Sequence, residues 1–203
     1  MSRLLLCLSS LHKRNKGFQV IKLILAWGLL AVLPAVHVSS VAAPVVADFP
    51  THIDVEFSPD GKAEKLVLRV INGSRSKLRM AAYSFTSPAV VRALIAAHRR
   101  HVDVKVFVDE KANRQKVSRS ALNLLAQAGI ETRTVSMYGI QHDKYVVADG
   151  STVQTGSFNY TKAAARSNSE NVLVIWQQPA LAEQYEKHWN SRWTKGVPYK
   201  PGY

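Results

Sequence analysis

The sequence predicts an α/β domain in which helices flank both faces of a mixed β-sheet, and two observations lead to this class. After residue 50, short runs rich in β-branched residues alternate with segments whose apolar residues recur at helical spacing. Between two of the later apolar runs, the dipeptide Asp149-Gly150 is typical of a tight hairpin turn. Strand–helix–strand alternation predicts parallel pairs and the hairpin an antiparallel pair, so the sheet is expected to be mixed.

The expected elements follow one another along a single domain with a sizeable core. The expected strands cover residues 52–57, 77–84, 102–108, 130–135, 145–148, 152–155 and 171–176. The expected helices cover residues 63–71, 88–100, 118–128 and 179–193. Ser87-Pro88 supplies an N-cap followed by proline at the first helical position, and Gly129 is typical of a helix end.

The beginning of the chain has the order of a secretory signal peptide. Residues 1–22 hold five basic side chains and no acidic one, residues 23–36 are apolar, and small residues follow. We expect a signal peptide over residues 1–43, with cleavage after residue 42, 43 or 47, and a periplasmic or secreted domain over residues 44–203.

Two alternatives concern this leader. Residues 23–47 carry no charge and are long enough to span a bilayer, so a retained anchor is the alternative to cleavage. Translation from near Val20 would leave a signal of ordinary length.

Cleavage would leave a basic domain without cysteine, because Cys7 is the only cysteine in the chain. The remaining residues include 22 basic and 14 acidic side chains, a net charge of +8. Such an excess attracts polyanions, nucleic acid before anionic membrane. The expected partner is therefore DNA or RNA, with the membrane serving only as the export route. The alternative is a soluble cationic protein with no such partner.

The hairpin brings four polar residues together at its open end. A two-residue loop pairs Ala148 with Ser151. The same register predicts two further facing pairs: Lys144 with Thr155, and His142 with Ser157. Side chains alternate along a strand, so His142 and Lys144 are expected on one face, where Asn159 can join them.

Six spaced residues, H-x-K-x4-D-x6-G-S-x-N, resemble the signature of the phospholipase D superfamily: His142, Lys144, Asp149, Gly156, Ser157 and Asn159. Residues 80–86, 160–176 and 188–189 further resemble the single-motif bacterial EDTA-resistant endonucleases of that superfamily, the Nuc-like group. The resemblance covers nearly everything after about residue 50, and it implies a phospholipase D/nuclease-like fold.

The resemblance implies a role for each residue of the motif. His142 is expected to be the nucleophile that forms a phosphohistidine, and Glu170 to hydrogen-bond and orient it. Lys144, Ser157 and Asn159 are expected to compensate the charge on the phosphate oxygens. Asp149 belongs to the same catalytic motif, yet an aspartate before Gly150 needs no catalytic role, and we expect it to support the turn. Gly156 is expected to allow close backbone approach.

We expect neither a metal nor another cofactor in this site. Asp143 alternates away from His142, Asp149 lies at the turn, and only Glu170 remains near the motif. This set does not form a carboxylate cluster of the kind that holds a catalytic metal. The expected activity therefore persists in EDTA.

One copy of the motif suggests a homodimer. Larger relatives carry two copies, so that one histidine attacks while the other protonates the leaving group. A twofold axis that brings together two His142 side chains would give the same composite site. If each chain instead holds a complete site, then His98, His101 and His188 are the first candidates for the acid.

The leading hypothesis is thus an exported, metal-independent, largely nonspecific endonuclease. A phospholipase D that acts on membrane lipids is the alternative, and a degenerate phosphate-binding module is the non-enzymatic one. The basic runs at residues 99–101 and 111–116 are either phosphate contacts or solvated surface.

Overall fold

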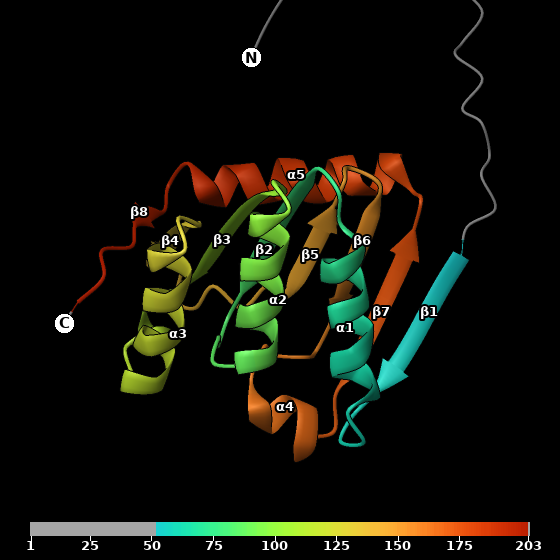
Figure 1. Cartoon of the computed structure of the whole chain (residues 1–203), viewed down its shortest axis with the longest axis horizontal. Coiled ribbons are helices and arrows are strands. Elements are labelled where there is room, and N and C mark those ends of the chain that lie inside the picture. The colour runs from blue at the N-terminus through green and yellow to red at the C-terminus, as the bar shows by residue number, and fades with distance from the viewer. Residues whose placement is uncertain (1–51, 203) are drawn as a thin grey trace, which may run out of the picture. The chain divides into compact units, whose positions relative to one another are not determined.

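A computed structural model of the chain describes residues 52–202. The expected signal peptide, its cleavage site and Cys7 therefore lie outside the described residues. The described residues form one eight-stranded sheet in the order β1-β7-β6-β5-β2-β3-β4-β8, with helices on both faces (Figure 1).

The elements have the following bounds. The strands are β1 His52–Phe57, β2 Lys77–Ala82, β3 Asp103–Asp109, β4 Glu131–Val135, β5 Tyr145–Ala148, β6 Thr152–Gly156, β7 Asn171–Trp176 and β8 Val197–Pro198. The helices are α1 Lys62–Gly73, α2 Pro88–Arg99, the 3-10 helix η1 Lys111–Asn113, α3 Lys116–Gln127, α4 Lys162–Arg166 and α5 Pro179–Trp193.

The sheet is mixed, as the sequence predicts. Strands β2, β3 and β4 are parallel neighbours, which the crossovers through α2 and α3 require. Strands β5, β6, β7 and β1 are antiparallel. The two halves join where β2 pairs antiparallel with β5, so the carboxyl ends of β2 and β3 meet the beginning of β5.

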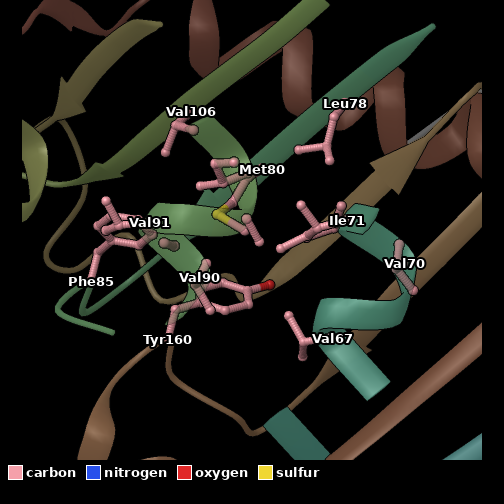
Figure 2. Packing of buried hydrophobic residues seen from close by; sticks show 14 of the residues in the cluster. Val67, Val70, Ile71, Leu78, Met80, Phe85, Val90, Val91, Val106 and Tyr160 are labelled. Carbon is pink, nitrogen blue, oxygen red and sulfur yellow. The ribbon is translucent and has the colours of Figure 1, made fainter. Parts of the chain in front are cut away.

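The larger part of the core lies between the sheet and helices α1, α2 and α3, which cover the near face in Figure 1. Helix α1 buries residues at helical spacing, and α2 begins as expected, with the Ser87 hydroxyl accepting from the Val90 N–H at 3.3 Å. Figure 2 shows how side chains from α1 and α2 meet Leu78, Met80 and Val106 of the sheet.

Helix α5 covers the other face and completes the predicted three-layer arrangement. Its Trp189 and Trp193 stack on each other with ring centroids 4.7 Å apart, and they pack with Phe107 and Val135 of the sheet. The Trp189 indole N–H donates to the Met80 carbonyl at 3.0 Å. Helices therefore flank both faces, as the prediction states.

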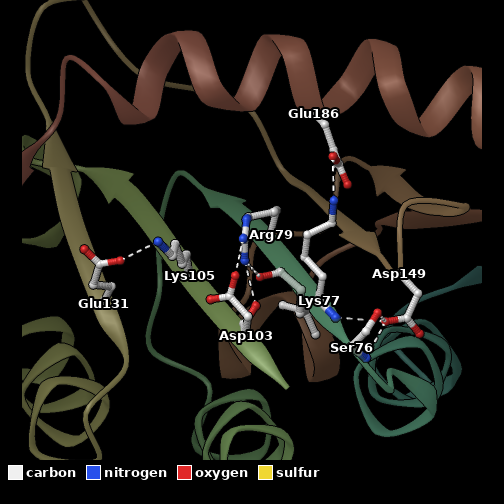
Figure 3. A network of polar contacts seen from close by, with 9 residues as sticks. Ser76, Lys77, Arg79, Asp103, Lys105, Glu131, Asp149 and Glu186 are labelled. Carbon is white, nitrogen blue, oxygen red and sulfur yellow. Dashed lines mark hydrogen bonds and ion pairs between the residues drawn. The ribbon is translucent and has the colours of Figure 1, made fainter. Parts of the chain in front are cut away.

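Charged side chains on this face are paired across strands. Lys77 contacts Glu186 of α5, and Lys105 contacts Glu131, at 2.8 and 2.7 Å, while Arg79 pairs with Asp103 (Figure 3). Each cation in this ladder has a carboxylate partner. The ladder therefore adds little to the attraction of a polyanion.

The predicted hairpin register is wrong by one residue. Ala148 pairs with Thr152, and Tyr145 with Thr155, so the loop holds three residues. Asp149 and Gly150 both have positive φ, as a tight hairpin turn needs, and the Ser151 N–H donates to the Ala148 carbonyl at 3.2 Å. Ser151 leaves the ladder because its carbonyl accepts from the Gln178 N–H at 2.6 Å.

Three short elements were not predicted, and the 3-10 helix η1 is one of them. Helix α4 spans five residues, too few for a helical period to be visible, and the Thr161 side chain caps it. Strand β8 pairs with the edge strand β4 and contains Pro198, a residue depleted in strands. Within residues 52–202, none of the helices combines the length and apolar character needed to span a bilayer.

Candidate active site

His142 and Lys144 of the motif lie where the two halves of the sheet join. A cavity of about 460 Å³ opens there, on the face of the sheet that α5 covers. Its lining comes from the segment before β5, from β5 and β6, and from α5: His142, Asp143, Lys144, Tyr145, Thr155, Gly156, Gln184, Tyr185 and His188.

His142 lies in the segment that precedes β5, and its side chain is exposed. The prediction that it belongs to the strand is wrong, because regular pairing begins at Tyr145. Its ring meets the ring of Tyr83 edge-on, with centroids 4.5 Å apart and an interplanar angle of 63°. Tyr83 follows β2, so the end of this strand supports the histidine. An exposed imidazole beside a cavity is accessible to a substrate.

Lys144 is 8% exposed. Its Nζ donates to the His142 carbonyl at 2.7 Å and lies 5.4 Å from the centroid of the Tyr83 ring. Burial lowers the pKa of Lys144, while the carboxylates of Glu170 and Asp143 raise it. The net result is a pKa for Lys144 below the usual lysine range.

The segment that carries His142 is anchored by Asp109, which is buried at the end of β3. The Asp109 carboxylate accepts from the Gln141 N–H at 2.8 Å and from the Ala112 N–H at 2.7 Å. The Gln141 side chain then donates to Asp143 at 2.7 Å. These bonds fix the segment although it has no strand partner. Because the segment is not a strand, its side chains need not alternate between two faces. Asp143 lines the same cavity as His142, contrary to the prediction.

The basic run at residues 111–116 divides into a structural part and an exposed part. Asn113 is buried, and its amide donates to the carbonyls of Tyr83 and Asp109 at 2.6 and 2.7 Å. Lys111, Arg114 and Lys116 are exposed, and Arg114 pairs with Glu110. Because it follows β3, the run lies at the same end of the sheet as His142.

The basic run at residues 99–101 lies before β3, at the end of the sheet opposite to His142. Its Arg100 guanidinium donates to three carbonyls at the end of α1: those of Ile71, Asn72 and Ser74. Arg100 thus satisfies a helix terminus. The structure does not bring Arg100 to the cavity.

Ser157 and Glu170 are in contact after β6. The Ser157 hydroxyl donates to Glu170 Oε2 at 2.6 Å and accepts from the Asn171 N–H at 3.1 Å. Glu170 also accepts from the Asn168 amide at 3.0 Å. Within residues 52–202 of one chain, Glu170 makes no hydrogen bond to His142. Its expected role in orienting that histidine therefore stays a prediction.

Asn159 lies in an irregular segment, and its amide oxygen is buried without a hydrogen-bond partner among the described residues. Leaving a buried amide oxygen unpaired costs free energy, and a ligand that donates a hydrogen bond to the Asn159 oxygen would remove this cost.

Gly156 ends β6 and has a φ of 151°, and a Cβ there would lie 2.3 Å from the Asn171 carbonyl oxygen. The expectation of close backbone approach is confirmed.

Asp149 lies at the other end of β5, in the turn. Its carboxylate accepts from the backbone N–H groups of Arg75, Ser76 and Lys77 at 2.8 to 3.2 Å, and from the Ser76 hydroxyl at 2.9 Å (Figure 3). Burial opposes ionisation, but these backbone hydrogen bonds lower the pKa of Asp149. The contacts tie the hairpin turn to the beginning of β2.

His188 enters the site from α5. Its Nδ1 lies 2.9 Å from the Tyr145 hydroxyl, and its Nε2 lies 3.8 Å from Asp143 Oδ2. Burial lowers the pKa of His188, the Asp143 carboxylate raises it, and Arg192 lowers it further. Neither His98 nor His101 lines the cavity.

A profile for the family described as cardiolipin synthase, PLD-like domain, matches residues 67–193, which is more than half of the chain. The chain belongs to the phospholipase D superfamily. The resemblance stated from the sequence is therefore confirmed, and with it the phospholipase D/nuclease-like fold.

Solved members of this superfamily share the fold. The chain is 48% identical to Nuc from Salmonella typhimurium, a phospholipase D family member, with a TM-score of 0.73 over 74% of this chain and 99% of that one. NucT from Helicobacter pylori is 19% identical with a TM-score of 0.67, over 73% of this chain and 99% of that one, which is a likeness of fold alone.

Two curated relatives carry names that refer to lipids. A phospholipase D from Rickettsia bellii is 38% identical over 136 residues, which cover 67% of this chain and 66% of the relative. A mitochondrial cardiolipin hydrolase from Xenopus laevis is 33% identical over 147 residues, which cover 72% of this chain and 65% of the relative. The chain thus spans just under two thirds of the length of these relatives.

The superfamily motif alone does not identify the residues that support the site or all those that line the cavity. Tyr83, Asp109 and Asn113 support His142 and Lys144, and Tyr83 lies in a segment that carries the resemblance. His188 was named only as a candidate acid for a complete single-chain site. No group of three or more histidine, cysteine, aspartate or glutamate side chains within residues 52–202 is arranged to hold a metal ion.

Proposed function

We propose that this chain is an exported, metal-independent phosphodiesterase hydrolase, most simply a nonspecific endonuclease. The observation that carries the proposal is the pairing of an exposed imidazole with a nearly buried ammonium group at the mouth of one cavity. The Lys144 ammonium group contacts the His142 backbone, so the cation and the nucleophile keep a fixed relation. Such preorganised charge is usually the largest single contribution to catalysis of this kind.

The reaction would proceed in two displacements. The His142 imidazole attacks phosphorus, a nitrogen–phosphorus bond forms, and the bond from phosphorus to the leaving oxygen breaks as that oxygen takes up a proton. Water then attacks the phosphohistidine, which restores the imidazole and releases a phosphate monoester. Lys144, Ser157 and Asn159 would compensate the charge on the non-bridging oxygens, and no metal ion enters either step.

Nucleic acid is the proposed substrate because the exposed cations at this end of the sheet have few partners. Lys111 and Lys116 follow β3, and Lys162 begins α4; all three are exposed. Exposed lysines at the same end of the sheet as a phosphodiesterase site suit the repeated phosphates of a polynucleotide. The net charge of +8 after residue 43 has the same sign.

One observation favours the alternative, a phospholipase D. Met137 and Ile140 lie directly before His142 and are 49% and 53% exposed, so apolar side chains do flank the site. An apolar rim of this kind also suits a lipid surface.

One experiment separates the two substrates. The purified full chain is incubated in EDTA with plasmid DNA and, separately, with phosphatidylcholine or cardiolipin vesicles. We expect nicking and fragmentation of the plasmid and no release of headgroup. Lipid cleavage without DNA cleavage would overturn the nuclease assignment, and loss of all activity in EDTA that zinc or magnesium restores would overturn the metal-independent mechanism.

We further propose that the active unit is a homodimer, and an apolar face of the sheet that no element within residues 52–202 covers supports this. On the α5 side, β1 presents Ile53, Val55 and Phe57, each at least 50% exposed, beside the half-buried Leu173 and Ile175 of β7. This apolar strip carries no charged side chain, which suits a second copy better than a polyanion or an anionic membrane.

The apolar strip is continuous with the floor of the cavity. Val55 pairs with Leu173, Leu173 with Thr155, and Thr155 with Tyr145, so one row crosses from the strip to the cavity lining. A partner seated on the strip would therefore lie next to His142, as a composite site requires.

Two tests address the dimer. Val55→Glu combined with Phe57→Glu should convert the protein into monomers in sedimentation and reduce turnover, whereas Glu56→Gln, on the opposite side of β1, should do neither. A tagged heterodimer of wild type and His142→Ala should retain far less than half of wild-type activity, since general acid catalysis is worth about 100-fold or more. Half activity would show that each chain holds a complete site.

Export from the cell is the remaining part of the proposal. The basic, apolar and small-residue order of residues 1–47 supports it. Mass spectrometry of protein from the cell envelope should find a mature amino terminus between residues 43 and 48. A chain that retains residues 23–47 would establish the anchor instead.

A further inference from the structure

The cavity around His142 is larger than a reaction at phosphorus requires. Its volume of about 460 Å³ falls in the range of about 300–1,000 Å³ found for pockets that enclose whole small molecules. His142 and Lys144 line one side, while Gln184, Tyr185 and His188 line the side formed by α5. The volume beside α5 is therefore available to a group that flanks the phosphate.

The side of the cavity formed by α5 is aromatic. The rings of Tyr185 and Tyr145 meet edge-on with centroids 5.0 Å apart, and the ring of Tyr145 lies 5.8 Å from that of His188. Residues 184, 185 and 188 share one face of α5 because residues three and four apart are neighbours on a helix. A planar group entering here would find aromatic surface on which to stack.

Beside this aromatic surface, His188 and Asp143 present a hydrogen-bond donor and an acceptor next to each other. Burial raises the pKa of the Tyr145 hydroxyl, so that hydroxyl keeps its proton, and its oxygen lies 2.9 Å from His188 Nδ1. The subsite described below takes the hydroxyl as the donor in this contact. Neutral His188 then carries its proton on Nε2, 3.8 Å from Asp143 Oδ2. That distance is too long for a strong hydrogen bond, so both groups can serve a ligand.

The aromatic surface, the donor and the acceptor together disfavour a second phosphate or an acyl chain beside the scissile phosphate. The Asp143 carboxylate would repel a second phosphate. An acyl chain has no use for a donor and an acceptor placed side by side, and would leave both unpaired. A nucleobase edge or a sugar hydroxyl supplies complementary groups, and a base also supplies a planar face.

We propose that Asp143, Tyr185 and His188 form a nucleoside subsite beside the scissile phosphate. The proposal rests on the proposed nuclease function and adds to it a source of selectivity for nucleotides over other phosphodiesters. In this subsite His188 donates from Nε2, Asp143 accepts, and Tyr185 stacks. Tyr145 positions His188 by fixing which of its nitrogens carries the proton.

The test compares substrates that share a phosphate and a leaving group but differ in the flanking group. These are the 4-nitrophenyl phosphate diesters of the thymidine 5′-hydroxyl, of the thymidine 3′-hydroxyl, of methanol and of choline. The full chain, Tyr185→Leu and His188→Gln are assayed in EDTA, together with Lys187→Ala, which lies on the exposed face of α5. The measured quantity is the ratio of kcat/KM between each diester and the methyl diester.

We expect wild type to prefer one thymidine diester over the methyl diester by about tenfold or more, and Tyr185→Leu and His188→Gln each to reduce that ratio about five- to tenfold. Lys187→Ala should leave the ratio unchanged. A ratio that stays constant in both pocket variants would overturn the subsite, and a preference for the choline diester that the variants abolish would replace it by a cation subsite.

A second measurement tests the positioning of His188. The ¹⁵N NMR spectrum of wild type should show neutral His188 with its proton on Nε2, and Tyr145→Phe should produce a mixture of tautomers together with a smaller thymidine preference. The proton on Nδ1 in wild type would overturn the assignment. Failure of the nuclease proposal is distinguishable, because plasmid DNA would then remain intact in EDTA whatever the diester ratios.

Discussion

Each end of the β5–β6 hairpin carries part of the superfamily motif, but different contacts fix the two ends. At the turn, Asp149 accepts three backbone hydrogen bonds and one hydroxyl hydrogen bond from residues 75–77. At the open end, His142 and Lys144 precede the strand, and His142 is exposed. Successive residues in a strand advance about 3.3 Å, so roughly 16 Å separates Asp149 from Lys144. One motif therefore contains both a chemical part and a part that builds the fold.

The largest effect should come from the exposed end. His142→Ala should reduce phosphodiester cleavage by a factor on the order of 10⁴ or more, because it removes the proposed nucleophile. Since the side chain is exposed, the thermal midpoint should stay within about 2 °C of wild type. Turnover of plasmid DNA in EDTA and thermal unfolding measure the two quantities. Retention of a tenth of the activity would contradict the role of His142.

Lys144→Met should reduce turnover by about 10²- to 10³-fold, since transition-state charge then loses a fixed cation. The matched control is Lys116→Met, an exposed lysine at the same end of the sheet, whose effect should be confined to a weaker salt dependence of DNA binding. Equal losses of turnover in the two variants would indicate that only the overall charge matters.

Glu170→Gln should reduce turnover by about tenfold, because the Ser157 hydroxyl loses a charged acceptor at 2.6 Å. Ser157→Ala should have a comparable effect, and the double variant should lose much less than the product of the two. Multiplicative losses would mean that Glu170 and Ser157 act independently and would contradict the inference that they act as one unit.

Asp149→Asn should change activity least and stability most. The free energy of unfolding at neutral pH should fall by about 1–3 kcal/mol, because backbone donors lose an ionised acceptor, while the turnover of folded protein should stay within about twofold. The lowered pKa of Asp149 means that its stabilisation is present above about pH 4 and is lost as the pH falls through the lowered value.

Urea unfolding at several pH values measures this contribution of Asp149. The stability difference between wild type and Asp149→Asn should therefore close in acid. A gap that does not shrink as the pH falls, or a large loss of turnover in folded protein, would contradict the proposed difference between the two ends of the hairpin.

The elements that extend over whole strands and helices were predictable, because hydrophobic periodicity and caps act locally. The Ser87 cap and the Asp149-Gly150 turn are examples. The exact hairpin register was not predictable, since Ser151 is drawn out of the ladder by Gln178, which is distant in sequence. The segment around His142 was taken for a strand because the buried Asp109 that anchors it comes from another part of the sheet.

The candidate active site also contains residues that the sequence predicted and residues that it did not. His142, Lys144 and Gly156 were recognised by their spacing, and all three line the cavity. The place of His188 depends on how α5 packs across the sheet, which a local pattern does not reveal. The facing of Asp143 was mistaken because strand alternation was assumed for residues that are not in a strand.

The pairing of β1 with β7 has a consequence for the order of events during synthesis. His52 opposes Trp176, and the cavity needs residues from Tyr83 to His188. Neither the edge of the sheet nor the cavity can therefore form while residues 171–188 are still within the ribosome. Contacts between residues so distant in sequence form slowly, because the loops between them must close first. A nascent chain of this protein is therefore unfolded at both places until these residues have been made, and its hydrolytic chemistry cannot arise before then.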